Sequence, residues 1–205
     1  MRNIRHPLIF IILLLYAGTS FGQSKALPIN LSLFNQATAL PFTSFFSTPV
    51  HPGIQIGTEF NYSTKAGSRF FQTANLSYFY HNYLAQGVGL SSELGYESRL
   101  KNGLAITGLL GLGYMHTFTT SEEFTFSDGT YHKQNDKGNS RLFPSLSLDL
   151  GYYLNPSRDS SPKVFVRYQS WAEYPYSPGF IPAMTHVNLH FGIKFFLHKN
   201  DHSHE

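Results

Sequence analysis

The sequence predicts an all-β protein, an antiparallel up-and-down transmembrane β-barrel of about eight strands. Three observations support this prediction: an export signal at the N-terminus, a low content of charged side chains, and a repeated alternation of apolar and polar residues. Charged residues make up 13% of the chain, about half of their usual share in globular domains. The outer face of a water-soluble β-sandwich would need more charge than this.

The N-terminus has the form of a secretory signal peptide. Arg2 and Arg5 precede an apolar run from Leu8 to Ala17, and small residues follow as far as Gly22. The run is shorter than the roughly 20 apolar residues that a membrane-spanning helix needs, so removal after export is favoured over an uncleaved anchor. The expected division of the chain is a signal peptide at 1–22, a barrel at 23–197 and a polar, His-rich tail at 198–205.

Composition excludes several classes of protein. The chain has no cysteine, so disulfides, thiolate metal sites and a lipid-modified N-terminal cysteine are ruled out. The formal net charge is +3, and the leader supplies Arg2 and Arg5, which leaves 3 − 2 = +1 for the exported chain. A nucleic-acid partner therefore has no electrostatic basis. No stretch after the leader is long and apolar enough for a transmembrane helix, so insertion into a membrane requires strands.

Seven segments alternate apolar and polar residues with a period of two, which is the pattern of strands with one apolar face. In the segment 52–64, Ile54 and Ile56 lie on one face of the expected strand. Gln55 and Glu59 lie on the other face. The seven expected strands are 52–64, 73–80, 87–100, 104–114, 141–154, 164–173 and 186–195.

An eighth strand is expected at 29–34, where Ile29, Leu31 and Leu33 alternate with Asn30 and Ser32. Single-chain bacterial barrels use an even number of strands, which favours this assignment. Short turns at 65–68, 101–103 and 155–162 then share one rim of the barrel. The longer segments near Phe42, at 120–140 and at 175–182 share the other rim. Short periplasmic turns, long external loops and periplasmic termini are the expected topology.

A sheet that spans lipid must close, because an unpaired edge finds no water, and its apolar face must point outward. The polar faces of the expected strands consist mainly of Gly, Ser, Thr and Asn with a few charges, which suits a crowded lumen. A soluble periplasmic barrel that binds a small ligand inside is the alternative. Interfacial aromatic girdles are predicted from residues near strand ends: Tyr78 with Tyr80, Tyr114 with Phe118, Tyr152 with Tyr153, and Trp171 with Tyr174 and Tyr176.

Charged and titratable residues recur in the inward register, so we predict a buried polar network that fills a barrel too narrow for an open pore. A narrow solute path through these residues is the alternative. The predicted network consists of Glu59, Glu93, Glu97, Arg99, Asp149, Arg167, Glu173, His186, His190 and Lys194.

The C-terminal stretch from His190 to Leu197 reads His-Phe-Gly-Ile-Lys-Phe-Phe-Leu. It resembles the polar-x-Gly-x-x-aromatic-x-apolar signal of bacterial outer-membrane proteins, and 29–197 resembles the small eight-stranded barrels among them in architecture. The resemblance implies location in the outer membrane, contact with its lipid, and recognition of Gly192, Phe195 and Leu197 by the barrel assembly machinery. It implies no activity, because a fold does not specify a function.

Enzyme activity is the less favoured interpretation. His186-Val187-Asn188 is faintly similar to the His-x-Ser of outer-membrane lipid A deacylases, but Asn188 cannot act as a nucleophile. No cofactor is expected. His198, His202 and His204 could bind a metal ion, although a polar tail explains them better, so no metal site is predicted.

The expected role is therefore structural or one of surface interaction, with a solute path or lipid A modification as alternatives. Loops on a rigid scaffold commonly carry binding residues. The predicted contact residues for a surface partner, including stacking on sugars, are Tyr174, Tyr176 and Phe180.

Overall fold

The computed structural model describes residues 26–198, apart from 83, 123, 134, 159 and 178. The predicted signal peptide at 1–22 and the tail from 199 onward lie outside the described residues. No helix in the described part of the chain is long and apolar enough to cross a membrane.

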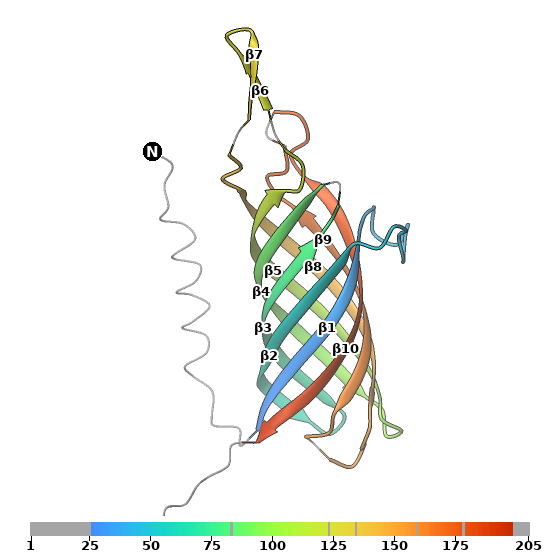
Figure 1. Cartoon of the computed structure of the whole chain (residues 1–205). Helices are drawn as coiled ribbons and strands as arrows, with labels where there is room; N and C mark the ends of the chain where they lie inside the picture. Colours follow the sequence, from blue (N-terminus) through green and yellow to red (C-terminus); the bar gives the residue numbers. More distant parts are fainter. Residues whose placement is uncertain are drawn as a thin grey trace, which may run out of the picture.

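Eight strands form a closed antiparallel barrel in the order β1-β10-β9-β8-β5-β4-β3-β2 (Figure 1). The predicted fold is confirmed, and the eighth strand is longer than the sequence pattern indicated. The barrel strands are β1 (Ala26–Thr38), β2 (Pro52–Lys65), β3 (Ser68–Tyr80), β4 (Ala85–Arg99), β5 (Leu104–Thr119), β8 (Asn139–Tyr153), β9 (Lys163–Glu173) and β10 (Met184–His198).

The first and last strands close the barrel by pairing with each other. The register runs from Ala26 opposite His198 to Thr38 opposite His186, so β1 is paired along its whole length. On its other side β1 pairs with β2, for example Leu31 with Ile56. The eight barrel strands therefore leave no open sheet edge, which is the condition for a sheet in lipid.

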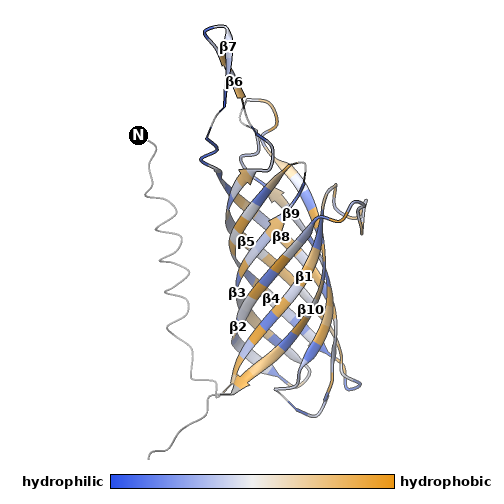
Figure 2. Ribbon diagram, in the orientation of Figure 1, coloured by the Kyte–Doolittle hydropathy of each residue, from blue (hydrophilic) through white to orange (hydrophobic). Residues whose placement is uncertain are grey.

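The two faces of the barrel wall differ in chemistry. Leu148, on the outer face of β8, is 56% exposed, whereas Glu93, on the inner face of β4, is 1% exposed. Figure 2 shows apolar residues alternating with polar ones along the strands. An apolar exterior around a polar interior is the reverse of a soluble ligand-binding barrel and matches a barrel that spans lipid.

The two ends of the barrel carry different connections. One end, which we call the turn rim, has the connections 66–67, 100–103 and 154–162, together with the start of β1 and the end of β10. The opposite end, the loop rim, carries longer loops at 39–51, 120–138 and 174–183, and one four-residue connection at 81–84. The predicted asymmetry is present, except that the β3–β4 connection on the loop rim is also short.

Part of the segment predicted as a surface loop at 120–140 is a two-stranded hairpin. It consists of β6 (Phe124–Ser127) and β7 (Thr130–Lys133), which project beyond the loop rim (Figure 1). Asp128 and Gly129 form its turn with φ angles of 53° and 78°, the two positive values that a tight hairpin turn requires. Asp-Gly between short β-forming runs is the local cause.

Substitution of Leu148 by arginine tests the orientation of the wall. Leu148→Arg would place a charge near the middle of the lipid-facing surface and should lower the free energy of unfolding by about 2 to 4 kcal/mol. Tyr131→Arg, on the projecting β7, is the matched control and should change it by less than about 0.5 kcal/mol. Reversible folding titrations in lipid vesicles measure both values. Equal tolerance of the two substitutions would contradict the assignment of the outer face.

Candidate functional site

The interior of the barrel is filled by its own charged side chains. Below its mouth at the loop rim, the lumen holds four carboxylates and four cations among the described residues, so their formal charges sum to 4 − 4 = 0; all are buried except Arg69, whose side chain is 11% exposed. The carboxylates are Glu59, Glu93, Glu97 and Asp149, and the cations are Arg69, Lys163, Arg167 and Lys194.

Glu97 is the centre of the cluster nearest the turn rim. Its carboxylate accepts from Arg69 Nε at 2.7 Å and from Lys163 Nζ at 2.7 Å. The Tyr153 hydroxyl donates to the same carboxylate at 2.6 Å, and Thr107 Oγ1 donates to it at 3.2 Å. Glu97 thus joins side chains from five strands, β3, β4, β5, β8 and β9. This satisfies a carboxylate that burial would otherwise penalise heavily.

Arg69 joins this cluster to Glu59 on β2. Its Nη1 forms an ion pair with Glu59 Oε2, and Lys194 Nζ donates to the same oxygen at 2.9 Å. The other oxygen of Glu59 accepts from Asn30 Nδ2 at 3.0 Å. Because Asn30 and Lys194 belong to β1 and β10, the network also crosses the closure of the barrel.

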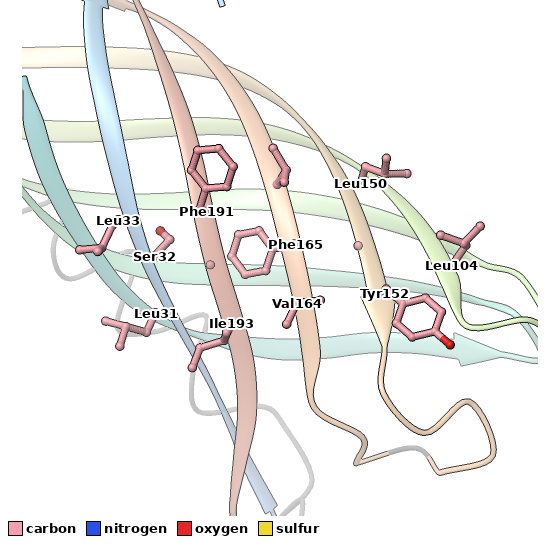
Figure 3. A pocket seen from close by; sticks show the side chains of 13 residues that line it. Leu31, Ser32, Leu33, Leu104, Leu150, Tyr152, Val164, Phe165, Phe191 and Ile193 are labelled. Atoms are coloured by element: carbon pink, nitrogen blue, oxygen red, sulfur yellow. The ribbon is translucent and has the colours of Figure 1, made fainter. Parts of the chain in front are cut away.

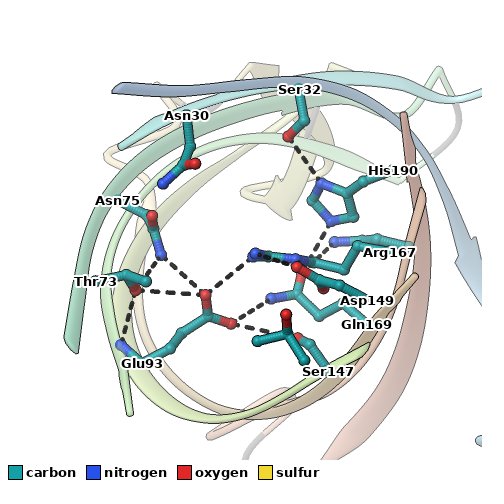
Figure 4. A network of polar contacts seen from close by, with 12 residues as sticks. Asn30, Ser32, Thr73, Asn75, Glu93, Ser147, Asp149, Arg167, Gln169 and His190 are labelled. Atoms are coloured by element: carbon teal, nitrogen blue, oxygen red, sulfur yellow. Dashed lines mark hydrogen bonds and ion pairs between the residues drawn. The ribbon is translucent and has the colours of Figure 1, made fainter. Parts of the chain in front are cut away.

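A second cluster surrounds Arg167 halfway along the lumen (Figure 4). Its guanidinium makes a two-pronged contact with Asp149, at 2.7 and 3.0 Å, and its Nη1 lies 3.0 Å from Glu93 Oε2. Asn75 Nδ2 donates to the same Glu93 oxygen at 3.1 Å. Charge-assisted, two-pronged pairs of this kind hold their geometry more firmly than single contacts.

His190 extends this second cluster towards β1. It is fully buried, and its Nδ1 lies 3.1 Å from Ser32 Oγ while its Nε2 lies 3.3 Å from Gln169 Oε1. Both ring nitrogens therefore have neutral partners. The ring also lies 4.7 Å, centroid to centroid, from Phe34 in the next layer.

An aromatic layer separates the charged clusters from the loop rim. It consists of the aromatic side chains Phe34, Phe79, Phe143 and Trp171 together with the thioether side chain of Met115. The cavity beside it measures about 20 Å³, room for about one water molecule.

Inward-facing glycines make room for these rings. A Cβ atom at Gly113 would lie 2.2 Å from the Phe143 ring, and one at Gly53 would lie 2.1 Å from the Phe34 ring. On the inner face of β5, Gly111 and Gly113 thus leave room for Ser145 and Phe143 of β8.

His186 lies above the aromatic layer, at the mouth of the lumen on the loop rim. Its Nε2 lies 3.3 Å from Glu173 Oε2, its Nδ1 lies 3.3 Å from Thr38 Oγ1, and its ring stacks on Trp171 at 4.2 Å. Glu173 also pairs with Arg141 at 3.0 Å. A hydroxyl, an imidazole and a carboxylate in a row can relay a proton. Here the same contacts also fix the imidazole across the mouth.

Two further histidines cover the mouth. The rings of His51 and His81 stack at 3.5 Å. Burial, followed by the neighbouring His51 and His186, lowers the pKa of the His81 imidazole.

The structure places most of the predicted network residues in the lumen and sets one apart. Arg99, at the end of β4, is half-buried, donates to the carbonyl of Pro156 and lies 4.0 Å from the Tyr153 ring centroid. It braces the turn at 154–162, because its position at the strand end lets the side chain leave the lumen. Glu173 and His186 are at the mouth. The predicted residues in the interior are Glu59, Glu93, Glu97, Asp149, Arg167, His190 and Lys194.

Sequence reasoning missed three cations. Arg69, Lys163 and Arg141 each stand at or near the start of a strand, next to residues assigned to turns or loops. Each continues the inward register of its strand, as Lys163 does with Phe165 and Arg167. Extending the alternation by one or two steps would have found Arg69 and Lys163, and Arg141 already has the inward parity within the expected strand 141–154.

Two predicted girdle residues face the lumen instead of lipid. Tyr153 and Trp171 are 2% and 5% exposed. Tyr153 has the same register as Asp149, and its hydroxyl reaches Glu97. Trp171 has the register of Arg167 and packs against Phe143 at 5.6 Å. The alternation along the strand, which can be read from the sequence, therefore decides whether a residue faces the lumen or lipid. Its distance from the end of the strand does not.

The remaining predicted residues lie on the wall or the loop rim. Gly192 faces the Phe165 ring, from which an added Cβ would be only 2.4 Å distant. Phe195 is half-buried and Leu197 is exposed. Tyr174 is exposed, Tyr176 lies below Arg141, and Phe180 is 83% exposed. No group of three or more histidine or acidic side chains in the described part of the chain could hold a metal ion.

Removing the cation from the Arg167 ion pairs should lower the free energy of unfolding far more than removing one partner of a surface ion pair. Arg167→Met removes the cation and leaves Asp149 and Glu93 short of a partner, so it should lower the free energy of unfolding by about 3 to 5 kcal/mol. The control is Lys133→Met, which removes the exposed ion pair with Glu122 and should cost less than about 1 kcal/mol. Denaturant titrations in vesicles provide the comparison. A loss for Arg167→Met no greater than that of the control would refute the network.

No family model and no curated protein matches the chain. Among solved structures, Neisserial surface protein A aligns with a TM-score of 0.49 and 9% identity over 85% of this chain and 98% of that chain. The outer-membrane enzyme PagL aligns with a TM-score of 0.47 and 10% identity over 82% of this chain and 98% of that chain. Ail, the attachment invasion locus protein of Yersinia pestis, aligns with a TM-score of 0.45 and 11% identity over 84% of this chain and 97% of that chain. These likenesses transfer no activity. By its own geometry, the described part of the chain is a closed eight-stranded antiparallel barrel with an apolar outer face, the arrangement of a barrel that spans lipid.

Proposed function

We propose that the protein is an integral barrel of the bacterial outer membrane with a sealed lumen, and that its role is structural or one of surface interaction at the loop rim. The observation that carries this proposal is the filled interior. Four acids and four bases neutralise one another within the lumen, and the cavity beside the aromatic layer above them measures only about 20 Å³.

A solute path is disfavoured by the same contacts. A conducting pore needs sites that bind a permeating ion weakly enough to release it, along a continuous opening. Here the charges that could attract an ion are already paired at 2.7 to 3.0 Å, as in the contacts of Glu97 and Arg167. Lipid A modification is disfavoured as well, because Asn188 is buried in the lumen, where it donates to Gln169 at 2.9 Å, and His186 is buried at the mouth of the lumen.

The outer wall supports contact with lipid. A shallow apolar depression of about 610 Å³ crosses β1, β10, β9, β8 and the start of β5 (Figure 3). Leu31, Val164 and Phe191 are among the side chains that line it. Acyl chains are the only part of a membrane that matches so apolar a surface at this depth.

The end of β10 supports recognition by the barrel assembly machinery. Phe195 and Leu197 continue the outward-facing register of Phe191 and Ile193, and Gly192 packs against Phe165. This strand makes the final pairing with β1, so a factor that binds it could hold the barrel open until closure.

The projecting hairpin supports the surface role. Phe126 and Tyr131 pack against each other at 5.0 Å between ring centroids, yet both remain largely exposed. Phe180 adds a third exposed ring on the loop rim. Rigid aromatic side chains are common anchors at interfaces because they bury much area at low entropic cost.

A planar-bilayer recording tests whether the lumen is sealed. The folded protein should give no stepwise conductance, because the paired charges and the aromatic layer block the path. A porin inserted into the same bilayer serves as the positive control. Reproducible ohmic steps from the protein would overturn the sealed-lumen proposal.

An epitope tag tests the direction of the barrel. Inserted between Asp128 and Gly129, at the tip of the hairpin, the tag should bind antibody on intact cells without loss of assembly, since a Cβ atom added at Gly129 would meet no described atom within 4 Å. A second tag between Asn102 and Gly103 on the turn rim is the control and should bind only after the outer membrane is permeabilised. The opposite pattern would place the loop rim in the periplasm.

A further inference from the structure

The loop between β1 and β2, residues 39–51, lies against the outer wall of the barrel. Its Phe42 amide donates to the Tyr168 hydroxyl at 2.8 Å, and the rings of Phe42 and Phe45 lie 5.4 and 5.1 Å from the Tyr168 ring. Tyr168 is the middle residue of β9 and belongs to its outer face. Figure 1 accordingly shows this loop beside the wall, whereas the β6–β7 hairpin projects beyond the rim.

The burial of nearby wall residues agrees with this placement. Val187 on β10 and Ala37 on β1 belong to the outer face, yet they are 2% and 7% exposed, against 63% for Leu33 on the same wall. Asn35, next to them, donates to the carbonyl of Ser47 at 2.9 Å. The loop therefore covers a strip of the wall near the loop rim.

The loop has the chemistry of a surface made for an apolar medium. From Ala39 to His51 it contains no Asp, Glu, Lys or Arg, in contrast to the segment 120–138 on the same rim, which carries several charges. Large apolar side chains are nevertheless exposed along it. These are Leu40, Phe42, Phe45, Phe46 and Val50.

Three of the four hydroxyl groups of the loop donate to backbone carbonyls of the protein. Thr43 Oγ1 donates to the Leu40 carbonyl at 2.7 Å, Ser44 Oγ donates to the Phe46 carbonyl at 3.3 Å, and Ser47 Oγ donates to the Gln36 carbonyl at 3.1 Å. Hydroxyls held in this way need no water. Backbone and hydroxyl groups must find protein partners in this manner where lipid replaces solvent.

We propose that the loop 39–51 is immersed in the outer leaflet of the membrane, with Phe46 and Val50 in contact with lipid. This inference rests on the proposed membrane location and extends it from the strands to a loop. Lipid is the occupant because the loop lies on the wall that already faces acyl chains, so its exposed rings continue that surface. The loop widens the apolar belt on the side of β1, β10 and β9.

Spin labelling tests this placement, and the absence of native cysteine makes each label unique. Phe46→Cys, Leu148→Cys on the wall and Ser127→Cys on the hairpin would each carry a nitroxide in the protein folded into lipid vesicles. Power saturation with oxygen, which partitions into lipid, and with a water-soluble nickel chelate reports the surroundings. The ratio of oxygen to nickel accessibility at Phe46→Cys should exceed that at Ser127→Cys severalfold and stay below that at Leu148→Cys, because oxygen concentrates towards the middle of the bilayer and the loop lies nearer to the rim.

The outcomes separate this inference from the proposed function. A lipid-like ratio at Leu148→Cys with a water-like ratio at Phe46→Cys would overturn the loop placement alone. Low access of both reagents to Phe46→Cys would also overturn it and would show that protein covers the loop. A water-like ratio at Leu148→Cys would instead refute the membrane barrel. If Phe46→Cys fails to fold, Val50→Cys, which is also exposed, takes its place with the same expectation.

Discussion

The rest of the structure depends on one constraint, the closure of the backbone hydrogen-bond ladder. In lipid an unpaired strand edge would leave amide and carbonyl groups without any partner, so β1 and β10 must meet along their length. A closed sheet has only an inside and an outside. Once its apolar face is turned to lipid, every second residue of every strand enters a lumen about as wide as its own side chains.

The charges of the lumen follow from this confinement. The carboxylates that point inward cannot reach bulk water, so they pair with cations from other strands, as Glu97 of β4 does with Lys163 of β9 and Glu59 of β2 with Lys194 of β10. Such pairs add little stability relative to a well-packed apolar core. We expect their main effect to be on register, because a slip of one residue would turn these charges towards lipid.

The alternation of apolar and polar residues in the sequence predicted which side chains of a strand face outward. It did not predict the inward-facing residues at the ends of the strands. Alternation located all eight barrel strands and their outer faces, including Leu110 and Leu148. It did not find Arg69 or Lys163, because both lie beside turns, where the polar pattern of a strand and that of a turn look alike. The position of the loop 39–51 depends on a contact with Tyr168, which is 126 residues away from Phe42 in sequence. No local pattern encodes such a contact.

Amide hydrogen exchange of the protein in lipid vesicles tests closure most directly. The seam pair Leu31 and Ile193 is the critical site, and Leu94 with Leu110, between β4 and β5, is the reference within the wall. A closed barrel predicts that the amides of β1 and β10 are protected as strongly as those of β4 and β5. Fast exchange confined to β1 and β10 would show an open sheet with two free edges and would contradict the closed barrel.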